Sequence, residues 1–172
     1  MNLRRVALLT VPLLLLWAIQ TEVNHLLSSR QLFFFAGGLY VAFIALTQPF
    51  GAGLAAVLIA GLACDANAPV AFGTHAALFG FAHNIIFRMR DRIPKDDAIA
   101  ATLLALFANF GLFLVMSALL SPGGPAAWPR LAADLVCSQV IITLVTPWFF
   151  SLQGRLLDLV ETALALRAER LR

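Results

Sequence analysis

The sequence predicts an all-α membrane protein in which six transmembrane helices form a compact bundle, with the N- and C-termini both in the cytoplasm. Hydrophobic residues make up 61% of the 172 residues and charged residues only 12%. The mean hydropathy of +0.89 lies far above the range of soluble domains. The apolar residues form long runs, and the charged residues fall almost entirely between them. This pattern is typical of a multi-pass membrane protein.

The first apolar run covers residues 6–19 and follows a short basic start. A basic and then apolar start also occurs in signal peptides, but no small-x-small cleavage site follows here, so we interpret the run as an uncleaved first span. The polar residues 21–31 are then expected to form the first outer loop.

Residues 32–64 are too long for one crossing of roughly 20 residues and fit two short crossings. The turn between them is expected near Pro49 and Gly51, because proline ends a helix and glycine tolerates the backbone angles of a tight turn. Spans two and three are therefore predicted at 32–48 and 50–65. Both are short, which leaves a tilted or partly re-entrant path open.

The second half of the chain supplies the other three predicted spans, at 70–87, 98–120 and 131–150. The most charged stretch, 88–97, separates spans four and five, and a Ser-Pro-Gly-Gly-Pro turn separates spans five and six. An amphipathic pattern follows to the end of the chain. We therefore divide the chain into a six-span bundle at 1–150 and a cytoplasmic C-terminal helix at 151–172.

The orientation follows from the basic residues. In this topology most of the twelve lie on one side, namely Arg4, Arg5, Arg88, Arg90, Arg92, Lys95, Arg155, Arg167, Arg170 and Arg172, and only Arg30 and Arg130 lie on the other. The positive-inside rule places the larger group in the cytoplasm. A net charge of only +3 gives no reason to expect nucleic acid as a partner.

Small residues recur at helical spacing in three spans and predict close helix packing. They are Gly53, Ala56, Ala60 and Ala63 in span three, Gly73, Ala77, Gly80 and Asn84 in span four, and Ala98, Ala101, Ala105 and Ala108 in span five. Buried amides in lipid usually bond across helices. Asn84 and Asn109 are one candidate pair.

The stretch from Gly61 to Gly80 carries the most distinctive polar residues. Asp65 lies between two apolar segments, where a carboxylate must reach the water interface or be held by its neighbours. Asp65 and Asp134 are the acids near the outer span ends, and simple solvation at the interface remains an alternative for both. The spacings match no catalytic, cofactor-binding or metal-binding motif. We therefore expect no enzyme activity, cofactor or metal.

Two segments resemble the MreD family of bacterial rod-shape-determining membrane proteins. The first is Gly61-x-x-x-Asp65 followed by Phe72-Gly73, an apolar span and a basic loop. The second is the proline-containing end of the last span, from Val145 to Arg155. Together with length and topology, the resemblance covers about residues 35–156.

This resemblance implies a non-enzymatic scaffold of the elongasome in the bacterial inner (cytoplasmic) membrane, which helps to maintain rod cell shape. The expected partner is an MreC-like protein with a single span, and through it MreB and the RodA and transpeptidase pair that makes lateral peptidoglycan. The chain could also form a homodimer. The expected partner-binding residues are Asp65, Pro69, Gly73 and His75 at the outer end of a groove, and Arg88, Arg90 and Arg92 facing cytoplasmic partners or anionic membrane lipid.

The family also resembles the substrate-binding (S) subunits of energy-coupling-factor transporters, which share a six-helix fold. A vitamin or metal transport subunit is therefore the alternative function. Such subunits tend to carry an Ala-x-x-x-Ala contact motif in the first span, which residues 6–19 lack. Their polar pocket would have to come from Glu22, His25, Asp65 and Asn67.

Overall fold

The computed structural model describes residues 3–66, 70–94, 97–120 and 128–169, and within these ranges it is all-α, without a β-strand. The helices are α1 (Leu3–Leu27), η1 (Ser28–Arg30), α2 (Gly37–Thr47), α3 (Phe50–Asp65), α4 (Thr74–Met89), η2 (Arg90–Arg92), α5 (Ala98–Leu120) and α6 (Trp128–Glu169). The predicted all-α class is confirmed. The boundaries of α3 and α5 are those predicted from sequence.

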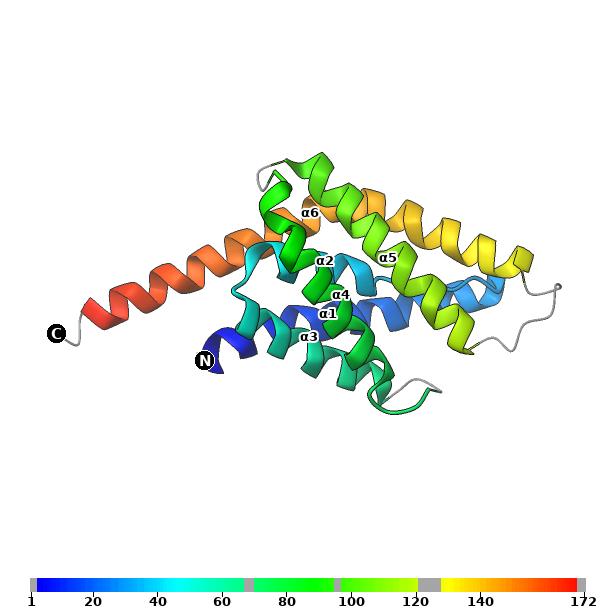
Figure 1. Ribbon diagram of the computed structural model, residues 1–172, viewed down its shortest axis with the longest axis horizontal. Helices are drawn as coiled ribbons and strands as arrows, with labels where there is room; N and C mark the ends of the chain where they lie inside the picture. Colours follow the sequence, from blue (N-terminus) through cyan, green and yellow to red (C-terminus); the bar gives the residue numbers. More distant parts are fainter. Residues whose placement is uncertain (1–2, 67–69, 95–96, 121–127, 170–172) are drawn as a thin grey trace.

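The α-helices run alternately in opposite directions along the long axis of the molecule (Figure 1). α1 begins and α6 ends on the left-hand side of that view, where η2 also lies. α3 and α5 end, and α4 and α6 begin, toward the opposite side. We call the side with η2 the inner end and the other side the outer end.

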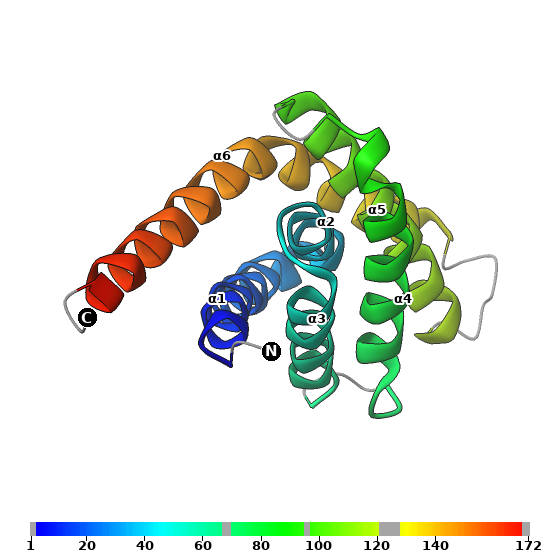
Figure 2. The same cartoon turned by 60° about the vertical axis from the view of Figure 1, so that its left-hand side comes forward.

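α2 is the centre of the bundle. Every residue from Gly38 to Leu46 is buried, and the other α-helices surround α2 when it is seen nearly end-on (Figure 2). A helix that is apolar all round is expected in such a place. At Gly38 the contact with α5 is between backbones, since a Cβ there would lie 2.1 Å from the amide nitrogen of Asn109.

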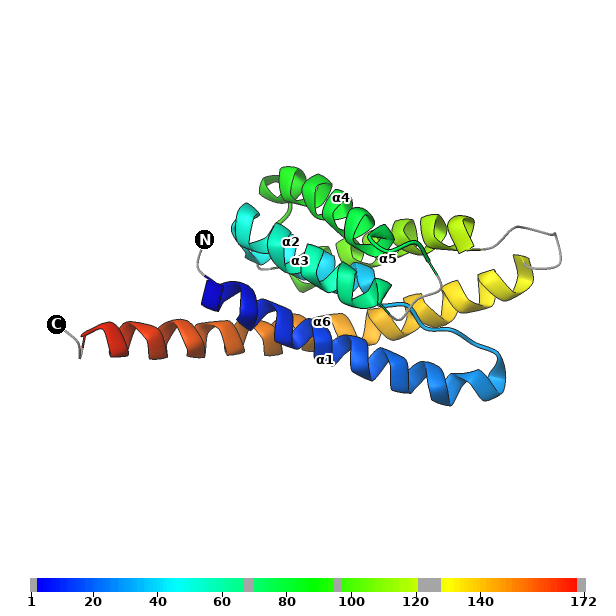
Figure 3. The same ribbon diagram turned by 90° about the horizontal axis from the view of Figure 1, so that it is seen from below.

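The predicted helix over 32–48 is wrong in its first third. Residues 32–36 are not helical, and α2 begins only at Gly37. This 32–36 segment leads from the outer end of α1 back toward the centre of the molecule (Figure 3). Five residues of open chain reach up to about 17 Å and an 11-residue helix about 16 Å.

Two helices are long and apolar enough to cross a membrane, namely α5 and the Trp128–Leu157 part of α6; α2 and α3 are shorter apolar helices. Large apolar side chains project from α5 and α6 without cover from the rest of the molecule, among them Leu103, Phe107, Leu119, Val136, Leu144 and Trp148. α6 runs without a break through Pro147 and past residue 150. The predicted amphipathic C-terminal stretch is therefore, up to Glu169, the last part of this helix.

The predicted small-residue stripes are confirmed in part. Ala98 is exposed, Ala63 and Ala108 are only partly buried, and of the α4 stripe only Gly80 approaches α3, where a Cβ would lie 3.1 Å from the Leu58 side chain. Gly53, Ala56 and Ala60 of α3 are buried, as are Ala101 and Ala105 of α5. In α4 the buried residues are instead His75, Ala76, Phe79, His83 and Ile86, and all of these except Ala76 are large. The aromatic and imidazole rings fill space that the small residues of α3 leave, as at Gly53, where a Cβ would lie 2.6 Å from Nε2 of His83.

Candidate functional site

The junction between α3 and α4 is built around the carboxylate of Asp65, which is only 4% exposed. Its Oδ2 accepts hydrogen bonds from the backbone N–H of Gly73 at 2.9 Å and of Ala76 at 3.4 Å. Its Oδ1 accepts one from the backbone N–H of His75 at 2.8 Å. The side chain at the end of α3 therefore caps the start of α4.

Local sequence explains why α4 needs this external cap. Its N-cap residue, Gly73, has a φ of +98° and no side chain to offer to the first turn. The first N–H groups of a helix lack partners within the helix, and they carry a partial positive charge that favours an anion. Asp65 satisfies both needs.

Gly61 brings the two helices close enough for this cap. A Cβ at Gly61 would lie 2.3 Å from Cα of Ala76 and 2.4 Å from its amide nitrogen. Gly61 and Asp65 are four residues apart, so both lie on the face of α3 that contacts α4. In the Gly-x-x-x-Asp pattern, the glycine thus lets α3 and α4 approach closely and the aspartate caps α4.

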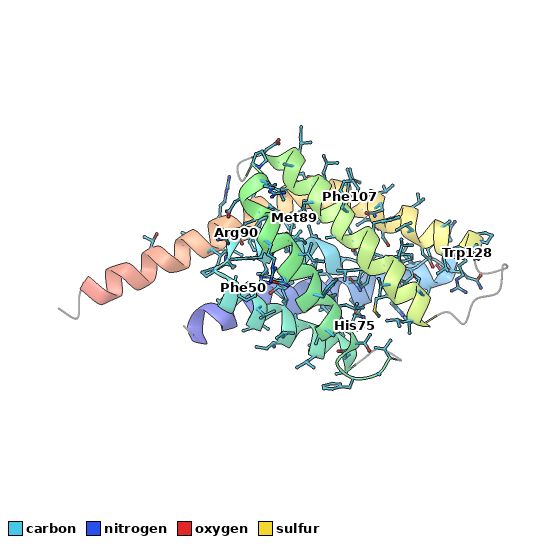
Figure 4. All side chains as sticks on the ribbon, viewed as in Figure 1. Phe50, His75, Met89, Arg90, Phe107 and Trp128 are labelled. Carbon is cyan, nitrogen blue, oxygen red and sulfur yellow. The ribbon has the colours of Figure 1, made fainter. Side chains whose placement is uncertain are left out.

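His75 completes the junction. Its Nδ1 lies 2.8 Å from Oδ1 of Asp65; because a carboxylate only accepts, this nitrogen carries a hydrogen and donates it. The ring also meets Phe79 edge-on. Figure 4 shows His75 well apart from Phe50, Met89 and Arg90, which lie close together nearer the inner end.

The structure thus brings together three of the predicted outer-end residues, Asp65, Gly73 and His75. Pro69 lies outside the described residues. The alternative of a simply solvated carboxylate is wrong for Asp65. Next to this junction, Phe72 is 72% exposed, and we did not predict it as a site residue.

A second polar cluster, which sequence reasoning missed, holds the 32–36 segment against α1. The backbone N–H of Phe34 donates to Oδ1 of Asn24 at 2.6 Å, and Nδ2 of Asn24 donates to the Phe34 carbonyl at 2.9 Å. The N–H of Ala36 donates to Oε1 of Gln20 at 2.9 Å. Gln20 and Asn24 belong to α1, which continues through most of the predicted outer loop.

The intervening residues of the segment bond to α6. The N–H of Phe33 donates to Oδ1 of Asp134 at 2.8 Å, and the N–H of Phe35 donates to the hydroxyl oxygen of Ser138 at 3.1 Å. Asp134 is therefore also buried and bonded, and the solvated alternative is wrong for it too. The donors of Phe33, Phe34, Phe35 and Ala36 turn alternately to α6 and α1, as in an extended chain.

A sequence signal for this cluster exists. Gln20 with Asn24, and Asp134 with Ser138, are two pairs of polar residues at a spacing of four, the second pair within an apolar run. Each pair presents polar groups on one face of a helix. In the structure these four side chains, from two helices, accept hydrogen bonds from the backbone N–H groups of the 32–36 segment.

The basic residues of the inner end have different surroundings. Arg90 donates from Nη1 to the Gln48 carbonyl at 3.0 Å, and its guanidinium carbon lies 3.9 Å from the centre of the Phe87 ring. This arginine ties the turn after α2 to the end of α4. Arg88 and Arg92 are exposed.

The predicted pairing of Asn84 with Asn109 is wrong. Oδ1 of Asn84 accepts from Nε of Arg88 at 3.2 Å on the same helix. Oδ1 of Asn109 accepts from the backbone N–H of Gly38 at 3.1 Å. The amide of Asn109 thus serves the start of α2.

The chain matches no protein-family model, no curated protein and no solved structure.

Proposed function

We propose that this chain is a non-enzymatic membrane scaffold of the elongasome, which binds an MreC-like single-span protein and helps to organise lateral peptidoglycan synthesis. The proposal rests on the resemblance to the MreD family and on one structural observation. The polar side chains of the outer end are bonded to backbone groups of neighbouring elements and hold those elements in place. This arrangement suits a rigid docking platform.

The apolar exterior supports a location in the bacterial inner membrane with six crossings. Phe107, Leu144 and Trp148 are among many large apolar side chains left exposed, and such side chains would face lipid. The four bonded N–H groups of the 32–36 segment matter here as well. Non-helical backbone at membrane depth is tolerated where protein surrounds it.

The two ends of the bundle would serve different partners. At the outer end, Asp65, Gly73 and His75 shape the surface indirectly, and exposed Phe72 is the group beside them that a partner can touch. At the inner end, exposed Arg88 and Arg92 would face anionic lipid or cytoplasmic partners such as MreB.

Co-purification of a tagged chain with the MreC-like protein of its host tests the outer-end proposal. Phe72→Ala is expected to reduce recovery of the partner. Phe107→Ala is the matched control, because Phe107 is equally exposed at 72% but lies midway along α5. If both variants still recover the partner as well as the wild type does, the outer end is not part of the interface. Depletion of the chain in its host should cause rod cells to round up.

One observation favours the alternative, an S subunit of an energy-coupling-factor transporter. The second crossing is broken into an open segment and a short helix, a device that transporters use at substrate sites. The predicted pocket residues lend it less support, because Asp65 is engaged with α4, Glu22 and His25 are exposed on α1, and Asn67 lies outside the described residues. Normal cell shape with lost uptake of a vitamin or metal after depletion would favour this function over the scaffold.

A further inference from the structure

The start of α2 lies near mid-depth of the bundle and depends on Asn109 of α5. Asn109 is completely buried, and its Oδ1 accepts the N–H of Gly38. Its Nδ2, which can donate two hydrogen bonds, has no partner among the described residues. The oxygen of this amide thus bonds to α2, and its nitrogen has no hydrogen-bond partner among the described residues.

A second side-chain amide, that of Gln139 on α6, has an acceptor oxygen without a donor in the described part of the chain. Nε2 of Gln139 donates to the carbonyl of Leu106 at 3.2 Å. The other end of the same group, Oε1, is buried and accepts from no described residue. Leu106 and Asn109 are three residues apart on α5 and so neighbour each other on its surface. The open donor therefore belongs to Asn109 itself, and the open acceptor belongs to a side chain that bonds to α5 one turn before Asn109.

Both open atoms are buried, although the Gln139 side chain as a whole is only partly buried. An amide group without a hydrogen bond at a buried site costs about 1–3 kcal/mol by protein measurements. One small molecule that accepts from Asn109 and donates to Gln139 would satisfy both groups. A hydroxyl-type O–H does this, and water is the smallest molecule that carries one.

We infer that one water molecule binds between these two side chains, where it accepts a hydrogen bond from Nδ2 of Asn109 and donates one to Oε1 of Gln139. The water completes the polar contacts at the start of α2, where the chain changes from the 32–36 segment to helix. This site goes beyond the proposed docking function and does not depend on it.

Nuclear magnetic resonance of the full chain in lipid nanodiscs tests the site. Asparagine side chains are labelled with ¹⁵N, and the Asn109 signal is assigned by its loss in Asn109→Asp. The nanodiscs are made from deuterated lipids that have no hydroxyl groups. A cross-peak to an exchangeable proton at the water frequency then cannot come from lipid. The Asn109 side-chain amide is expected to show a cross-peak at the water frequency, and Gln139→Leu is expected to abolish it.

Two variants serve as controls. Gln139→Glu keeps an acceptor oxygen and should retain the cross-peak. Thr143→Val lies one turn further along α6, where the hydroxyl bonds to its own helix at the Gln139 carbonyl, and it should also leave the cross-peak unchanged. If the folded wild-type chain shows no water cross-peak, or if a direct cross-peak joins the two side chains, the inference is overturned. A cross-peak that appears only with hydroxyl-bearing lipids would overturn it in favour of a lipid ligand.

Discussion

Oδ1 of Asp65 accepts two hydrogen bonds from one residue, His75, at 2.8 Å from its backbone nitrogen and 2.8 Å from its Nδ1. A single carboxylate oxygen thereby fixes the start of α4 and the orientation of the first buried ring on that helix. The link from α3 to α4 includes residues 67–69, yet the helix ends on either side of it are joined by this side chain. Asp65 is therefore expected to matter first for the structure of the outer end and through it for any partner.

Asp65→Asn should destabilise the folded chain. The substitution removes the charge, and it leaves one of the two acceptor oxygens replaced by an NH₂ group that faces backbone donors. The loss should be about 1–3 kcal/mol, the range for breaking buried hydrogen bonds to a charged group. Thermal unfolding in detergent measures it. Asp91→Asn, at an exposed carboxylate, is the control and should leave the midpoint nearly unchanged.

Gly61→Ala should also destabilise the α3–α4 junction, because the added Cβ meets the backbone of Ala76 at 2.3 Å. Overpacking of this kind typically costs about 1–3 kcal/mol. The matched control is Gly111→Ala in α5, where a Cβ meets nothing within 4 Å. Alanine is the better helix former, so this control should stabilise by about 0.5–1 kcal/mol. Equal unfolding midpoints for the two variants would contradict the close approach of the helices.

Asn24→Ala should loosen the 32–36 segment. The variant removes both hydrogen bonds to Phe34 and leaves its N–H and carbonyl without these partners. Amide hydrogen exchange should speed up over residues 33–36, while exchange in the middle of α5 stays unchanged. Thr21→Ala is the control, because that hydroxyl bonds only within α1, to the Trp17 carbonyl. Faster exchange in the control as well would mean that α1 itself frays.

Reporter fusions should place the two ends of the bundle on opposite sides of the membrane. A fusion after Arg92 is expected to be cytoplasmic, and one after Arg30 periplasmic, because the arginines concentrate at the inner end. A periplasmic reporter after Arg92 would refute the six-crossing topology. Replacement of Arg88 and Arg92 by glutamate should weaken the cytoplasmic preference, whereas Arg30→Glu should not.

Several elements follow from local sequence alone. The start of α3 and the end of α5 were predicted to the residue, because Pro49 and the Ser-Pro-Gly-Gly-Pro sequence end helices whatever packs around them. The all-α class follows from composition and run length. The segregation of the arginines likewise needs only counting.

The tertiary structure decided the rest. Residues 32–36 are as apolar as the residues of the neighbouring helices, and no local sequence feature distinguishes them from the start of a helix. Their backbone groups leave the helical pattern because Gln20 and Asn24 on one side, and Asp134 and Ser138 on the other, offer them partners; the α6 partners lie 101 and 103 residues away in the chain. Likewise, the sequence marks Asp65 as a carboxylate that must be held, but only the packing of α3 against α4 shows which N–H groups hold it. In an apolar environment a backbone group must find a partner, and which partner is in reach is a property of the folded chain.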